Sequence, residues 1–253
     1  MPTLLDLHNR VAVVIGATSG LGRALAVGLA AHGATVVPTG RREAQLKEIC
    51  EQLGTTLIHA CDVTDRASLD AFRDATLATY GHVDILVNAA GITCKHPTAT
   101  LPEVSWMALL ETNLNGAMRA CQCFYQPLKA SGRGRIINIT SLGAYTAFHE
   151  VAAYCAAKSG LQSLTRSLAC EWARDGISVN AIAPGVFPTE LNQHIIHDTP
   201  RGRELLMRTP MARFGRPEEL VGPAVLLASD GASYITGQCI TVDGGYLASG
   251  VNS

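Results

Sequence analysis

The chain has 253 residues, of which 47% are hydrophobic, and a formal net charge of −1. These values predict one large α/β domain with a self-sufficient core. They argue against electrostatic binding to nucleic acid or to an anionic membrane. No apolar run approaches the ~20 residues of a membrane helix, and the first ten residues lack a signal-peptide pattern. We therefore expect a cytoplasmic protein whose eight cysteines are reduced thiols.

The first strand, turn and helix form a phosphate-binding pattern. Residues 11–15 are an apolar run typical of a buried parallel strand, and residues 23–32 are predicted to be helical. Between them lie Gly16, Gly20 and Gly22, in the spacing G-x-x-x-G-x-G. Glycines allow a tight turn and a close approach of the backbone to a pyrophosphate, and the helix start supplies free N–H groups. The segment is therefore a candidate dinucleotide site.

Strands and helices continue to alternate along the chain. Further strands are expected at 35–39, 55–60, 84–88, 135–140, 178–182 and 238–242. Further helices are expected at 43–53, 65–80, 104–130, 154–173 and 216–228. Short links between alternating elements predict a doubly wound parallel sheet of seven strands, with helices on both faces. The expected fold is a single Rossmann-like α/β domain over residues 1–253.

The end of the second strand bears on the choice of nicotinamide cofactor. An NAD site usually has an acidic residue there, on the ribose 2′-hydroxyl. This chain has Arg41 and Arg42 instead, with no acid before Glu43. Two guanidiniums suit a 2′-phosphate, so we predict NADP, with NAD as the alternative. The two arginines could also simply solvate the start of a helix.

A second candidate site follows the fifth expected strand. Tyr154 and Lys158 are four residues apart, so on a helix they share a face. A fixed cation nearby favours the phenolate and lowers the pKa of a tyrosine, which suits proton transfer near neutral pH. Ser141 stands at the carboxyl end of a strand, where open α/β sheets bind ligands. Taken alone, a Tyr–Lys pair at this spacing is more often an exposed pair without function.

Taken together, the motifs resemble those of the short-chain dehydrogenase/reductase family, in its form of roughly 250 residues. Ser141 precedes Tyr154 by the 13 positions that the family pattern requires. The matching pieces cover nearly the whole chain: Gly16-x-x-x-Gly20-x-Gly22, Asp62-Val63, Asn88-Ala-Ala-Gly91, Asn113, Ser141, Tyr154-x-x-x-Lys158, Pro184-Gly185 and the closing Val242-Asp-Gly-Gly245.

The resemblance implies a role for each catalytic candidate. Tyr154 would be the general acid or base, and Lys158 would lower its pKa and hold the nicotinamide ribose. Ser141 would hydrogen-bond the substrate oxygen, and Asn113 would hold a water in a proton relay. Because all four are present, a non-catalytic binding or regulatory protein is the less favoured alternative. No metal is implied.

The resemblance also implies the residues that bind the cofactor. They are Gly16, Thr18, Ser19, Gly20, Leu21, Gly22, Arg41, Arg42, Asp62, Val63, Asn88, Ala89, Ala90, Gly91, Tyr154, Lys158, Pro184, Gly185, Val186 and Thr189. Two positions depart from the family pattern. Ile15 replaces a threonine that ties the glycine turn to the Asn88–Gly91 loop, and Ser19 replaces a basic residue of many NADP-using members.

The region from 186 to 215 is the expected substrate lid. It is polar, and we expect it to face Lys95, His96 and His149, which with Ser141 and Tyr154 are the candidate substrate-binding residues. The sequence is most similar to gluconate 5-dehydrogenase-like members of the family. We therefore predict a sugar acid or polyol with a secondary hydroxyl. Alternatively, these charges form a solvated face, or the protein is a 3-oxoacyl-[acyl-carrier-protein] reductase.

Assembly is expected to follow the family. The helix from Tyr154 onward carries small and apolar residues at three- and four-residue spacing. In the family this helix and the one after Asn113 build a four-helix interface between subunits. We therefore predict a homotetramer with dihedral symmetry, and no nucleic-acid or membrane partner.

Overall fold

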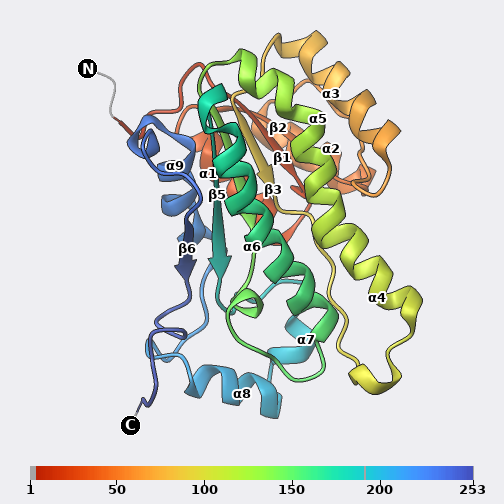
Figure 1. The fold of residues 1–253 in the computed structure, drawn as a ribbon, viewed down its shortest axis with the longest axis vertical. Helices are drawn as coiled ribbons and strands as arrows, with labels where there is room; N and C mark the ends of the chain where they lie inside the picture. The colour runs from red at the N-terminus through yellow and green to blue at the C-terminus, as the bar shows by residue number, and fades with distance from the viewer. Residues whose placement is uncertain (1–3, 191, 253) are drawn as a thin grey trace.

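The computed structural model describes residues 4–190 and 192–252, which form one parallel sheet between helices (Figure 1). Within these residues the sheet has six strands in the order β2-β1-β3-β4-β5-β6, all parallel. Their bounds are β1 Val11–Ile15, β2 Thr35–Thr39, β3 Ile85–Asn88, β4 Gly134–Ile139, β5 Ile177–Pro184 and β6 Cys239–Val242. The single Rossmann-like α/β domain is confirmed, but the predicted number of strands is wrong.

The missing strand is the one expected at 55–60, which runs beside β2 without a backbone ladder. The Thr35 N–H donates to the Arg10 carbonyl. The backbone N–H and C=O groups of odd-numbered β2 residues therefore point toward β1, and those of even-numbered residues point toward the outer edge. Pro38 is one of the outward residues, and it has no N–H to donate. Two hydroxyls make the link instead: Thr55 donates to the Val36 carbonyl and Thr39 to the His59 carbonyl, each at 2.7 Å.

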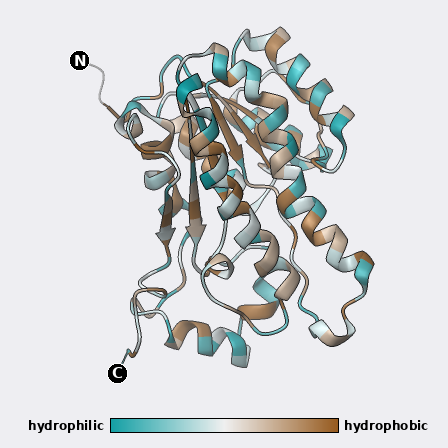
Figure 2. Ribbon diagram, viewed as in Figure 1, coloured by the Kyte–Doolittle hydropathy of each residue, from teal (hydrophilic) through white to brown (hydrophobic). Residues whose placement is uncertain are grey.

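Two hydrophobic layers hold the helices on the two faces of the sheet, where Figure 2 shows the strands to be strongly hydrophobic. One layer joins α1 and α9 to the sheet through side chains such as Leu25 and Val225. The other joins α3, α5 and α6 through Phe72, Phe124 and Leu168. The helices are α1 Gly20–Ala31, α2 Glu43–Leu53, α3 Arg66–Tyr80, α4 Glu103–Leu110, α5 Gly116–Ala130, α6 Ala152–Trp172, α7 Gln193–Ile196, α8 Pro200–Met207 and α9 Val221–Ala228.

Local signals in the sequence account for several helix ends. The Asp65 side chain accepts the Ala67 N–H at 2.9 Å and starts α3, and Gly81, with φ +80°, ends it. Two expected helices are interrupted. Residues 104–130 divide into α4 and α5 around a π-helical turn at Glu111–Asn115, and the start of 216–228 is a 3₁₀ turn at Pro217–Leu220 before α9.

The region expected to be a lid contains α7 and α8, which lie below the carboxyl ends of β5 and β6 in Figure 1. Its apolar side chains, among them Ile196 and Leu205, pack with Tyr246 near the end of the chain. In the described part of the chain, no helix has both the length and the hydrophobicity needed to cross a membrane.

Candidate active site

A cleft of about 540 Å³ opens at the carboxyl ends of the strands. The chain leaves β1 toward β2 on one side and returns to β3 on the other, so this is the switch point where doubly wound sheets bind ligands. Most of the predicted cofactor residues line it: Gly16, Thr18, Ser19, Gly20, Leu21, Gly22, Arg41, Arg42, Asp62, Val63, Ala89, Ala90, Gly91, Tyr154, Lys158, Pro184, Gly185 and Thr189. Chain segments far apart in sequence are thus brought together as expected.

The glycine turn is fitted closely to the loop after β3. A Cβ on Gly16 would lie 2.6 Å from the Ala90 nitrogen, and one on Gly22 would lie 2.2 Å from the Gly16 oxygen. Only glycine fits at either position, and Gly16 also has a φ of +85°. The Ala89 N–H donates to the carbonyl of Ile15 at 3.0 Å. Backbone contacts therefore join the two loops although Ile15 has no hydroxyl.

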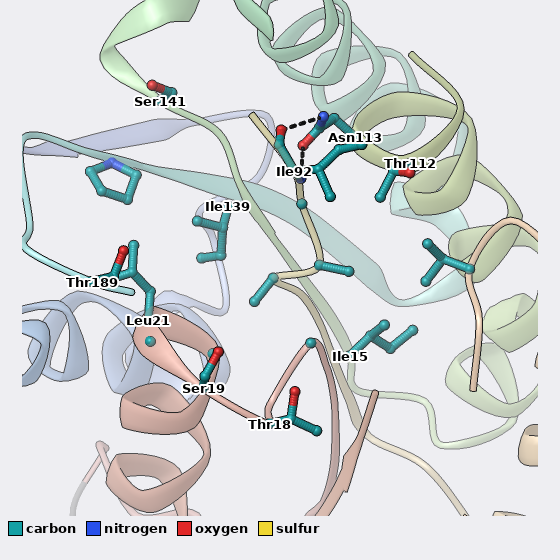
Figure 3. A pocket seen from close by; sticks show the side chains of 18 of the residues that line it. Ile15, Thr18, Ser19, Leu21, Ile92, Thr112, Asn113, Ile139, Ser141 and Thr189 are labelled. Carbon is teal, nitrogen blue, oxygen red and sulfur yellow. Dashed lines mark hydrogen bonds between the residues drawn. The ribbon is translucent and has the colours of Figure 1, made fainter. Parts of the chain in front are cut away.

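Two arginines stand at the other end of the glycine turn. The Arg42 guanidinium donates to the Thr18 hydroxyl at 3.2 Å and also to the Ser19 hydroxyl. Arg41 lies 3.9 Å from the Asp62 carboxylate. Thr18 and Ser19 are seen at this end of the cleft in Figure 3. The glycine turn and the arginines together form a surface suited to phosphate groups.

Tyr154 and Lys158 lie one turn apart on α6, as predicted. The Lys158 Nζ is 5.8 Å from the centre of the Tyr154 ring and donates to the Ile139 carbonyl at 2.8 Å. Burial lowers the pKa of Lys158 to about 8. Burial also raises the pKa of Tyr154, against a lowering effect of the Ser141 side chain. The expected lowering of the Tyr154 pKa by Lys158 is therefore not seen: the pKa is raised, because loss of hydration outweighs the effect of the Ser141 hydroxyl.

Asn113 explains the break in the long helix. Its side-chain amide donates to the carbonyls of Leu109 and Ile92, each at 2.9 Å, and its oxygen accepts the Ile92 N–H at 3.2 Å. Figure 3 shows this pairing of Asn113 with Ile92. Because the amide takes a carbonyl that an α-helix would use internally, the backbone widens into the π-helical turn. The side chain is 1% exposed and lines the cleft.

Two predicted cofactor residues lie outside the lining. The Asn88 side chain points into the core, where it donates to the Asn138 oxygen at 2.9 Å and to the Cys121 sulfur at 3.3 Å. Val186 packs with the lid residues Ile196 and Leu205. The residues next to them in sequence, Ala89 and Gly185, do line the cleft.

Three of the candidate substrate residues also lie outside the lining. Lys95 forms an ion pair with Glu150 at 3.1 Å, and the His96 N–H donates to the Glu150 carbonyl at 2.7 Å. The His149 side chain is 85% exposed. Arg201 of α8 donates to the His149 carbonyl at 2.9 Å, which joins α8 to the loop before α6. Ser141 and Tyr154 are the candidate substrate residues that do line the cleft.

Sequence reasoning missed part of the lining. Glu190 and Asn192 come from the segment 186–215, and Ile139 and Thr140 come from the end of β4. Asn192 shapes the lid loop, because its side chain donates to the Phe187 carbonyl and accepts the Thr189 N–H, each at 2.9 Å. Asn side chains often hydrogen-bond the backbone a few residues earlier, so Asn192 is a local indication of a turn here. The other lining residues missed are Ile15, Cys61, Ile92, Thr112 and Phe187.

Comparison with known proteins gives matches over nearly the whole chain. The family model described as Enoyl-(Acyl carrier protein) reductase matches residues 16–247. The D-threitol dehydrogenase of Mycolicibacterium smegmatis is 39% identical over 95% of this chain and 94% of its own. The gluconate 5-dehydrogenase of Gluconobacter oxydans is 37% identical over 98% of both chains. A crystal structure of a gluconate 5-dehydrogenase from Burkholderia cenocepacia J2315, in complex with NADP and tartrate, superimposes with a TM-score of 0.93 at 35% identity, covering 98% of both chains.

Proposed function

The chain belongs to the short-chain dehydrogenase/reductase family, and from this premise we propose that it interconverts a secondary alcohol of a sugar acid or polyol and the corresponding ketone. The observation that carries the proposal is the convergence of Ser141, Tyr154 and Lys158 on the same cleft as the glycine turn. The similar dehydrogenases of threitol and gluconate support the choice of substrate class.

The residues of the cleft fit a nicotinamide dinucleotide. Gly16 and Gly22 allow the tight turn and the close packing of strand, turn and helix that a pyrophosphate site requires, because a Cβ on either would collide with backbone atoms of the protein. Arg41 and Arg42 would hold a 2′-phosphate, so NADP is the proposed cofactor. The gluconate 5-dehydrogenase of known structure also binds NADP. When bound, this group supplies or accepts the hydride.

The chain's own residues would handle the proton and the substrate oxygen. Tyr154 gives its phenolic proton to that oxygen during ketone reduction and takes it back during alcohol oxidation. The Ser141 hydroxyl donates to the same oxygen as negative charge develops on it. The buried Lys158 ammonium places a positive charge beside Tyr154, which stabilises the phenolate that forms when Tyr154 gives up its proton. Asn113 fixes the backbone at Ile92.

Substrate and cofactor are tested together by initial rates. We expect turnover of gluconate, related aldonates or polyols such as D-threitol, with kcat/KM about tenfold or more higher for the NADP(H) couple than for NAD(H). Acetoacetyl thioesters provide the contrasting substrate. Activity confined to the thioesters would replace the proposal with 3-oxoacyl-[acyl-carrier-protein] reductase, and a clear NAD(H) preference would reverse the cofactor assignment.

The proposed assembly is a homotetramer. Support comes from exposed apolar side chains on α4, which continues through the π-helical turn into α5, one of the two helices of the predicted interface: Val104 is 75% and Met107 is 52% exposed. We expect light scattering at micromolar concentration to give four times the mass of the chain. If α4 contributes to the interface, Met107→Lys should lower the measured mass. Glu218→Lys is the control: it also changes a charge, but on the turn before α9, and it should leave the mass unchanged.

A further inference from the structure

Arg42 bridges the two sides of the cleft. On one side its guanidinium donates to Thr18 and Ser19 of the glycine turn. On the other side it meets Glu190 of the lid, with 3.4 Å between Nη1 and Oε2. The lid is close here, because a Cβ on Gly20 would lie 3.5 Å from the Thr189 side chain. Figure 3 shows Thr189 beside Leu21 at the start of α1.

The charges at this end of the cleft are already balanced within the protein. Arg41 is paired with Asp62, and Arg42 is paired with Glu190. All four side chains line the cleft. Because the two guanidiniums face two carboxylates, a phosphate that binds here competes with a carboxylate for the positive charge. The carboxylate that contacts Arg42 is that of Glu190, a residue of the lid.

We propose that Glu190 is a cofactor-specificity residue, whose carboxylate occupies the guanidinium that a 2′-phosphate needs. NADP then binds in competition with Glu190 for the Arg42 guanidinium, whereas NAD has no group that competes for it. The inference rests on the proposed function for the identity of the ligand. Glu190, which follows Thr189 in the lid, would thus weaken the binding of NADP and leave that of NAD unchanged.

The size of the effect follows from the exposure of the pair. The Arg42 and Glu190 side chains are 45% and 77% exposed, so their attraction is weakened by water. Removing the competing charge should therefore improve NADPH binding by a modest factor, about fivefold. NADH has no group that competes for Arg42, so its affinity should change by less than about twofold.

The experiment measures the Kd of NADPH and NADH by fluorescence titration of the full chain. The variants are Glu190→Gln, Arg42→Gln, the double variant and Glu204→Gln. Glu204 is a matched control, because it is an exposed glutamate of the same lid outside the cleft. Adenosine 2′,5′-bisphosphate and ADP repeat the comparison without a nicotinamide.

We expect Glu190→Gln to tighten NADPH and the bisphosphate about fivefold, and Glu204→Gln to leave both unchanged. In the Arg42→Gln background the same change should have little effect, because the competition has been removed. Equal tightening of NADPH and NADH, equal tightening with and without Arg42, or no tightening at all would overturn the inference. A preference of the wild type for NADH would overturn only the proposed cofactor. The role of Glu190 is judged separately, from the change in Kd that Glu190→Gln causes.

Discussion

Replacing Tyr154 with Phe is expected to lower kcat about 10³-fold for both reduction and oxidation. The phenol is the proton donor and acceptor proposed for the substrate oxygen, and it lines the cleft with Ser141 and Lys158. Phenylalanine keeps the ring but has no proton to transfer. The Kd of NADPH should stay within about twofold, because the ring's packing on α6 is retained.

Tyr145→Phe is the matched control for this prediction. Tyr145 is 45% exposed and lies outside the residues that line the cleft, so losing its hydroxyl should change kcat by less than about twofold. Steady-state rates and NADPH titrations of both variants make the comparison. If Tyr154→Phe retained kcat, or if a biological effect of the protein survived this substitution, the proposed chemistry would be wrong.

Lys158 is expected to make the stability of the protein depend on pH. Burial lowers its pKa in the folded state to about 8, from an ordinary value of 10.5. The unfolded chain therefore binds more protons than the folded one between these two values, and stability rises as pH increases across this range. Below pH 8 the burial penalty is present in full. Relative to a Lys158→Met variant, the wild-type free energy of unfolding should rise by about 3 kcal/mol between pH 7 and pH 10.5.

Urea denaturation of both proteins at pH 7, 8, 9 and 10 would test this prediction. Lys158→Met should abolish turnover at every pH, and Lys47→Met, on the exposed part of α2, supplies the baseline for losing a lysine. A stability difference between wild type and Lys158→Met that stays constant with pH would show that the ammonium is not penalised by burial. A difference that falls with pH would reverse the assigned direction.

Much of the fold could be predicted because its signals are local. β1, β2 and α2 were predicted at their observed bounds, since β-branched runs and helical periodicity need no knowledge of neighbours. The strand expected at 55–60 failed because the outcome depended on Pro38 of another segment. The π-helical turn follows from the Asn113 amide, which binds the Leu109 carbonyl and is also held by Ile92, 21 residues earlier in the chain.

The site was predictable to a similar extent. Spacing in the sequence identified Ser141, Tyr154 and Lys158 because α6 and the end of β4 fix their positions. The pKa of Tyr154 was not predictable, since it depends on how much water the surrounding chain removes. The partners of Lys95 and Arg42, namely Glu150 and Glu190, come from loops whose course follows from tertiary packing alone.

The proline in β2 has a consequence beyond the count of strands. β2 is the last strand on its side of the sheet, and such borders can recruit extended segments of other molecules and seed aggregates. At Pro38 an incoming segment would find no amide hydrogen, and at Val36 it would find the carbonyl already bound by Thr55. The border of the sheet is thereby protected against intermolecular pairing twice, by residues 55–60, which lie along it, and by Pro38, which offers no amide hydrogen.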